Sequence, residues 1–124
     1  MEIIYLIGRI LFAAIFVSGG YGHLTKSKQM GSYAKSMAVP AAELMTIISG
    51  IMILVGGILV VFNFYVFYGA LLIFLFLIPT SFMMHAFWKL QDAGMKQVQQ
   101  IMFMKNMSMA GACLMIMYLT YGAR

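Results

Sequence analysis

Long apolar stretches separated by short polar connections run along the whole chain. Residues 3–21 are apolar apart from Arg9 and a few small residues near the end of the stretch. Residues 44–88 contain no Asp, Glu, Lys or Arg, and these ~45 residues would extend about 67 Å as a single helix. Because the hydrocarbon core of a bilayer is about 30 Å thick, this second stretch must hold two membrane-crossing helices joined by a turn.

The position of that turn follows from the one strongly polar residue near the middle of the stretch, Asn63. We therefore expect one all-α domain over residues 1–124, an up-down bundle of four transmembrane helices at 3–21, 40–62, 64–87 and 101–121. Pro40 suits the first turn of the second helix, where its missing N–H costs nothing. Pro79 lies inside the third helix, where it should cause a kink that the hydroxyls of Thr80 or Ser81 relieve.

The longest connection spans residues 22–39 and has an amphipathic pattern. Apolar or aromatic residues, among them Met30, Tyr33 and Met37, recur there at spacings of three and four between lysines and serines. This spacing predicts a short helix that lies in the membrane interface. The preceding segment has neither a basic start nor a small-residue cleavage pattern, so we expect it to be a retained helix and not a signal peptide.

Composition places the protein in the bilayer. Hydrophobic residues make up 64% of the chain and charged residues only 9%, against roughly 25% charged residues in soluble domains. The formal charge of +5 is explained by topology and by anionic lipid, and we expect no nucleic acid partner. The single cysteine, Cys113, lies in an apolar run and is expected to be a small packing residue.

The lysines indicate the orientation of the bundle. Four crossings place both termini and the Asn63 turn on one side, which carries Glu2, Arg9 and Arg124. The first and third connections, with the helix ends beside them, carry six lysines on the other side: Lys26, Lys28, Lys35, Lys89, Lys96 and Lys105. The positive-inside rule therefore predicts cytoplasmic basic connections and outside termini.

Two charged residues lie within or beside the apolar helices. Arg9 lies roughly 9 Å below the membrane surface, and it either extends its guanidinium to the interface or has a partner inside the bundle. Glu43 begins the second helix, where the helix dipole favours an anion. Glu43, Gly50 and Gly57 recur every seven residues on one helix face, and small residues mark a helix contact. We therefore expect Glu43 to point into the bundle.

Polar residues from four helices are expected at the basic face. His23 closes the first helix, Glu43 begins the second, His85 lies near the end of the third, and Lys105 and Asn106 lie near the start of the fourth. The alternative is an ordinary interfacial histidine and a solvated helix start. Ionisable groups within a bundle instead favour a ligand site for a polar headgroup or a quinone carbonyl. No HxxH, ExxH or CxxC pattern is present, so no metal is expected.

The chain also has 14 methionines. Thioethers are soft ligands that suit copper(I), and four methionines fall close together at positions 102, 104, 107 and 109. These four do not share one helical face, and methionine is a flexible filler of irregular cores. Packing in the core or against lipid is therefore the favoured interpretation.

Short motifs in a fixed order resemble the DoxX family of small four-helix membrane proteins. They are Gly8-Arg9, the run Gly19-Gly20-Tyr21-Gly22-His23-Leu24, Glu43-Leu44 with Ser49-Gly50 and Gly56-Gly57, His85-Ala86-Phe87-Trp88, and Phe103-Met104-Lys105-Asn106-Met107 before Gly111. The resemblance implies site roles for Arg9, Glu43, His85, Lys105 and Asn106. It also implies membrane partners of redox systems. Where the family often has lysine, this chain has His23.

Three functions remain open on these grounds. The first is an accessory or ligand-binding subunit of a membrane oxidoreductase complex, with a site formed by Arg9, His23, Glu43, His85, Lys105 and Asn106. The second is a quinone-linked redox enzyme subunit, which would need an electron donor from a partner. The third is a transporter of a small solute or lipid. The expected partners are membrane lipids and other membrane subunits or further copies of the chain. No intrinsic cofactor is expected, and quinone and lipid are the candidate bound molecules.

Overall fold

The computed structural model describes all residues from Met1 to Arg124 as an assembly of helices without strands. The helices are α1 (Glu2–Thr25), α2 (Ser27–Ser36), α3 (Ala42–Val61), α4 (Val66–Met84), the short 3₁₀ helix η1 (Phe87–Lys89) and α5 (Ala93–Thr120). Four segments are long and apolar enough to cross a membrane: α1, α3, α4 together with η1, and α5. The expected all-α class and the four crossings are therefore confirmed.

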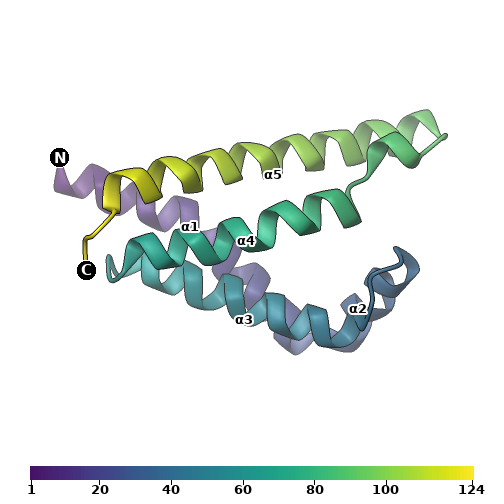
Figure 1. Ribbon diagram of the computed structural model, residues 1–124, viewed down its shortest axis with the longest axis horizontal. Coiled ribbons are helices and arrows are strands. Elements are labelled where there is room, and N and C mark those ends of the chain that lie inside the picture. The colour runs from purple at the N-terminus through teal and green to yellow at the C-terminus, as the bar shows by residue number, and fades with distance from the viewer.

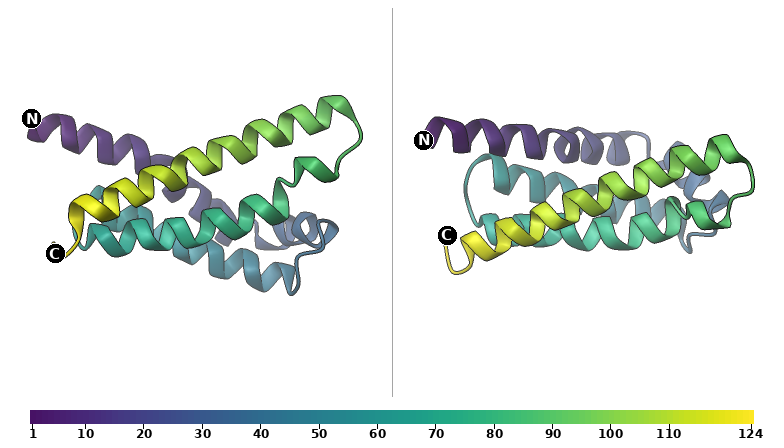
Figure 2. Two further views of the ribbon diagram at one scale, coloured as in Figure 1. Left: turned by 45° about the horizontal axis from the view of Figure 1, so that its top comes forward. Right: turned by 90° about the horizontal axis from the view of Figure 1, so that it is seen from above.

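The four long helices run up and down in sequence. Helix α3 packs against α1 on one side and α4 on the other, and α5 packs against α4 (Figure 1). Both termini and the turn between α3 and α4 lie at one end, while α2 and the connection between α4 and α5 lie at the opposite end (Figure 2). Near the α2 end, α5 and the α1–α3 pair diverge, and this divergence leaves room for a site.

Glycines allow the close helix contacts that hold the bundle together. Gly56 of α3 and Gly69 of α4 face each other, and a Cβ atom added to either would lie 2.8 Å from the carbonyl oxygen of the other. A Cβ on Gly20 of α1 would lie 2.8 Å from the carbonyl oxygen of Gly50 in α3. Such backbone contacts stabilise membrane helices because lipid supplies little hydrophobic driving force between them.

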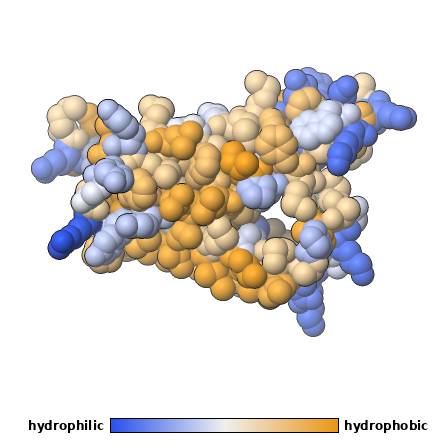
Figure 3. All heavy atoms as spheres, viewed as in Figure 1, coloured by the Kyte–Doolittle hydropathy of each residue, from blue (hydrophilic) through white to orange (hydrophobic).

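The core is small, and the outer surface is apolar. Fully buried side chains come from all four long helices and include Ala13, Val60, Ile73, Leu77 and Cys113. An apolar band covers the middle of the molecule, with polar residues at both ends (Figure 3). This distribution is that of a protein with lipid as its solvent, and Cys113 is the packing residue that the sequence predicts.

Helix α2 confirms the expected short helix in the first connection. It lies across the first turn of α3, where a Cβ on Gly31 would come within 2.8 Å of the Glu43 Cα. Gly31 and Ala34 are its buried residues, and Lys28, Ser32, Lys35 and Ser36 remain exposed. The first transmembrane helix continues to Thr25 and not only to residue 21, and His23 in this extension still packs against Gly50 of α3.

The second helix begins later than predicted. It starts at Ala42, so Pro40 lies in the turn before the helix and not in its first turn. Ala41, which precedes the helix, has a left-handed backbone with φ of 48°. The chain needs these residues to reverse direction after α2. The turn near Asn63 is confirmed, and Asn63 has φ of 55°, a conformation that asparagine tolerates better than most residues.

The last two helices differ most from the predicted boundaries. Helix α4 ends at Met84, so His85 follows the helix and is not inside it. Helix α5 begins at Ala93 instead of residue 101, because the Asp92 carboxylate accepts a hydrogen bond from the Met95 N–H at 2.9 Å. This N-cap starts the helix two turns early. Pro79 remains within α4, and the Ser81 hydroxyl donates to the Leu77 carbonyl at 2.6 Å.

Candidate functional site

A cleft of about 740 Å³ opens between the diverging helices at the α2 end. It is visible as a hollow in the surface on the face shown in Figure 3. Of its 29 lining residues, 18 are hydrophobic, and all five α-helices contribute to the wall. The volume lies in the range of small-molecule sites in proteins, roughly 300–1,000 Å³. A largely apolar wall with a few polar groups is the usual composition of such a site.

Four of the six predicted site residues line this cleft together. They are His23 from α1, His85 after α4, and Lys105 and Asn106 from α5. No acidic residue is among the lining residues, while Lys26 adds a second ammonium group at the rim. The cleft is therefore electropositive and suits a ligand whose polar end carries oxygen atoms.

His23 is held by the first half of α3. Its Nδ1 lies 3.2 Å from the Thr46 carbonyl oxygen and 3.0 Å from the Ser49 hydroxyl. Gly50 permits this approach, because a Cβ there would collide with the His23 Cβ. The ring of Phe76 in α4 lies edge-on to the imidazole, with 5.8 Å between ring centroids. His23 is thus fixed in the cleft wall by two neighbouring helices.

His85 is held by the extension of α5. Its Nδ1 lies 2.6 Å from the side-chain oxygen of Gln99. Gln99 falls within the two turns of α5 that the sequence assigns to a loop, so it is absent from the predicted site. The one signal for it is Asp92 followed by an amphipathic run, which is a typical helix start.

Asn106 is the buried polar residue of the cleft. Only 7% of the surface of Asn106 is exposed, and its side chain has no hydrogen-bond partner within the protein. The only side-chain nitrogen or oxygen that is fully sealed without a partner is Arg9 Nε, so the Asn106 amide atoms are open to the cleft. An amide placed this deep in a membrane protein without a partner is costly. A bound polar group would satisfy it.

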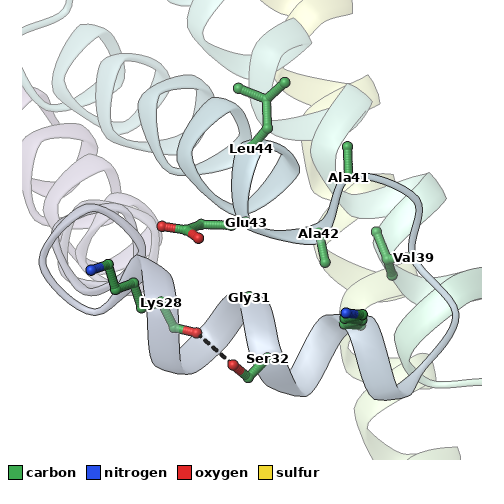
Figure 4. A pocket seen from close by; sticks show the side chains of 9 residues that line it. Lys28, Gly31, Ser32, Val39, Ala41, Ala42, Glu43 and Leu44 are labelled. Carbon is green, nitrogen blue, oxygen red and sulfur yellow. Dashed lines mark hydrogen bonds between the residues drawn. The ribbon is translucent and has the colours of Figure 1, made fainter.

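Glu43 does not join the cleft. It is exposed and lines a separate pocket of about 510 Å³ between α2 and α3, together with Lys28, Ser32 and Lys35 (Figure 4). The expectation that Glu43 points into the bundle is therefore wrong. Gly50 and Gly57 of the same heptad series do face α1, but α2 folds across the first turn of α3 and leaves the carboxylate outside the core.

Arg9 lies at the opposite end of the molecule. Its guanidinium donates a hydrogen bond to the Val61 carbonyl oxygen at 2.7 Å and lies over the Tyr5 ring, 4.8 Å from the centroid. Of the two alternatives for this residue, the partner inside the protein is the one observed. A cation at the last carbonyls of α3 is favoured by the helix dipole. Arg9 therefore stabilises the α1–α3 contact and is not part of the cleft.

Methionine is the most frequent residue type in the cleft wall. Seven of the 14 methionines line it: Met30, Met45, Met52, Met83, Met84, Met102 and Met109. They come from α2, α3, α4 and α5. The local cluster at positions 102–109 does not reveal this arrangement, because the methionines meet only when the four helices fold together. Flexible thioether side chains give the wall an adaptable shape.

Four apolar spans around an electropositive cleft define a multi-pass integral membrane protein. The chain belongs to the DoxX family, whose model matches residues 4–86. Inner membrane protein YqjF of Escherichia coli (strain K12) is 29% identical over 111 residues, which cover 90% of this chain and 79% of the relative. No solved structure matches the chain. The resemblance seen in the sequence motifs is confirmed, and the protein is a membrane protein of this family.

Proposed function

We propose that the protein binds a small amphipathic molecule of the quinone class in its cleft, as an accessory subunit of a membrane oxidoreductase complex. The observation that carries the proposal is the unpartnered amide of Asn106, 7% exposed, in a mostly apolar cleft. A ring with oxygen substituents would occupy the polar end beside Asn106, Lys105 and the two histidines. A hydrocarbon tail would lie along the methionine-rich wall.

The cleft favours binding over transport. Its lining residues extend only to Ile15 of α1, Ile53 of α3 and Leu75 of α4, which lie near the middle of these helices. None of the residues around the Asn63 turn or Arg9 lines it. A transport path across the membrane would have to continue to the end of the molecule that holds Arg9 and the Asn63 turn. Binding at a site that opens in one half of the bilayer is therefore the simpler function.

An accessory role is favoured over independent catalysis by the chemistry of the wall. The lining residues offer imidazoles, amides and ammonium groups, and none of these is an electron donor or acceptor. Electrons for a bound quinone would therefore come from a partner protein. The exposed apolar surface of α1 and α5 offers room for such a partner within the bilayer.

Native purification tests both parts of the proposal. The tagged chain is extracted into polymer-bounded lipid discs without crosslinker, and co-purifying proteins and extracted quinones are identified by mass spectrometry. The Asn106→Leu variant should lose most of the bound quinone, whereas Ser108→Leu, which changes an exposed residue of the same helix, should retain it. Recovery of the chain with neither a quinone nor an oxidoreductase subunit would refute the proposal.

A further inference from the structure

The hydrogen-bond partners of His23 favour one position for the proton on its imidazole ring. The Ser49 hydroxyl donates to the Thr46 carbonyl oxygen at 3.1 Å, and the same carbonyl lies 3.2 Å from His23 Nδ1. A carbonyl oxygen can only accept, so in a hydrogen bond to the Thr46 carbonyl the Nδ1 is the donor. In the neutral imidazole the other nitrogen, Nε2, then carries a lone pair and accepts.

In His85 the Nδ1 is likewise the donor, but its acceptor is a different group. The partner of His85 Nδ1 is the side-chain oxygen of Gln99, which is also an acceptor. With the Gln99 oxygen as its partner, the Nδ1 of His85 donates and its Nε2 is left as an acceptor. Neither Nε2 atom has a hydrogen-bond partner in the protein, and neither is sealed from the surroundings. Both side chains line the same cleft.

We infer that the cleft selects ligands whose polar end carries hydroxyl groups, because the Nε2 atoms of His23 and His85 present two acceptors that a carbonyl cannot satisfy. This inference rests on the proposed function, and within the quinone class it means that the reduced hydroquinone form binds more tightly than the oxidised form. Asn106 and Lys105 can serve either form, since the amide donates and accepts and the ammonium group donates to oxygen. Discrimination therefore comes from the imidazoles.

The size of the preference depends on the hydrogen bonds that are lost when the hydroxyl groups of the ligand are oxidised to carbonyls or converted to methyl ethers. A site built to bond a hydroxyl rejects an analogue that lacks it, because its own polar groups are then left unpaired. Two neutral hydrogen bonds together should give a preference of about tenfold or more. The hydrocarbon tail contributes equally to both forms and does not affect the ratio.

Matched ligands that do not undergo redox chemistry provide the test. A long-chain alkylresorcinol, with two hydroxyl groups, is compared with its dimethyl ether by equilibrium binding to the full chain in lipid nanodiscs at pH 8, with empty nanodiscs as the background. The ether partitions more strongly into lipid, so nonspecific binding works against the expected result. The wild-type protein should bind the resorcinol about tenfold more tightly.

Variants assign the preference to the two imidazoles. His23→Phe retains a ring against Phe76 but removes the acceptor, and each of His23→Phe and His85→Phe should reduce the ratio several-fold. The double variant should bind both ligands equally. His23→Gln restores an acceptor oxygen and should recover part of the preference, and thermal unfolding confirms that each variant is folded.

Three results would overturn the inference. Equal binding of the two ligands to the wild-type protein would refute the hydroxyl preference and leave a cleft that binds amphipathic molecules. A preference that survives in the folded double variant would assign it to other residues. Binding of neither ligand above the empty-disc background would overturn the inference and would also count against the proposed function.

Discussion

The Nδ1 of His85 and the side-chain oxygen of Gln99 lie 2.6 Å apart, and this contact joins the end of α4 to the first turns of α5. It depends on the early start of α5 at Ala93, which in turn depends on the Asp92 cap. One exposed carboxylate in a loop therefore contributes to the position of an imidazole in the cleft wall, although the two residues do not touch.

Removal of this cap should loosen the start of α5. Asp92→Ala removes the acceptor for the Met95 N–H, which costs about 1 kcal/mol of helix stability. Amide hydrogen exchange over residues 93–99 should accelerate several-fold, whereas exchange over residues 110–118 should stay unchanged. Asp92→Ser, which retains a capping oxygen, serves as the control and should exchange like the wild type. Unaltered exchange in Asp92→Ala would show that α5 does not need this cap.

The glycine contact between α3 and α4 should tolerate no side chain. A Cβ at Gly56 would lie 2.8 Å from the Gly69 carbonyl oxygen, so Gly56→Leu must separate the two helices. Overpacking of this kind costs about 1–3 kcal/mol, and the midpoint of thermal unfolding in detergent should fall accordingly. Gly111→Leu is the matched control, because nothing lies within 4 Å of its Cβ position. Equal midpoints for both variants would contradict the close contact.

Arg9 should affect stability and not ligand binding. Arg9→Leu removes the hydrogen bond to the Val61 carbonyl oxygen, and bonds to charged groups contribute about 1.5–3 kcal/mol. Thermal unfolding should therefore occur at a lower temperature, while the affinity of the folded variant for the alkylresorcinol stays at the wild-type value. Arg124→Leu, at the exposed C-terminus, should change neither quantity. A folded Arg9→Leu protein with strongly reduced affinity would place Arg9 in the ligand site after all.

Gly31 should control the contact between α2 and α3. Gly31→Leu brings a side chain against the Glu43 backbone, where even a Cβ would be 2.8 Å from the Cα. We expect α2 to separate from α3 and trypsin to cleave after Lys28 and Lys35 several-fold faster. Ser32→Leu changes a neighbouring exposed residue and should leave the cleavage rate near that of the wild type. Similar rates for the two variants would indicate that α2 is not held by this contact.

The orientation predicted from the lysines can be measured with single cysteines. Cys113 is buried, so a Cys113→Ala background accepts new cysteines at Lys96 and at Arg124, which lie near opposite ends of α5. A membrane-impermeant maleimide added outside intact spheroplasts should label Arg124→Cys, and the same reagent should label Lys96→Cys only in inverted vesicles. The reverse pattern would place the termini in the cytoplasm.

The sequence predicts the membrane spans well because lipid imposes a simple rule. A helix needs about 20 apolar residues to cross, and the four stretches meet that need even though their ends are misplaced. The ends depend on local contacts that hydropathy does not record. Helix α5 begins early because of a side-chain cap at Asp92, and α4 ends early because the chain turns at His85.

The candidate site was predicted in part for a related reason. The up-down order brings His23, His85, Lys105 and Asn106 to one end of the molecule, and the structure gathers them in one cleft. Glu43 begins α3 at the same end of the molecule but lies outside the cleft, in the pocket beside α2. The position of α2 cannot be derived from the lengths of the membrane spans. Ser49, which contacts the His23 imidazole, depends on packing between helices and has no separate signal in the sequence, and for Gln99 the one signal is the helix start at Asp92.

The seven methionines in the wall of the cleft have a consequence for the range of ligands that the proposed site would accept. Unbranched thioether chains rearrange at little cost, so the methionine-rich wall should accept hydrocarbon tails of different length and unsaturation. Affinity should be nearly flat along a homologous series with one headgroup and change sharply when the headgroup changes. The proposed site should therefore accept the same headgroup when a cell alters the tails of its lipophilic molecules with temperature or growth stage.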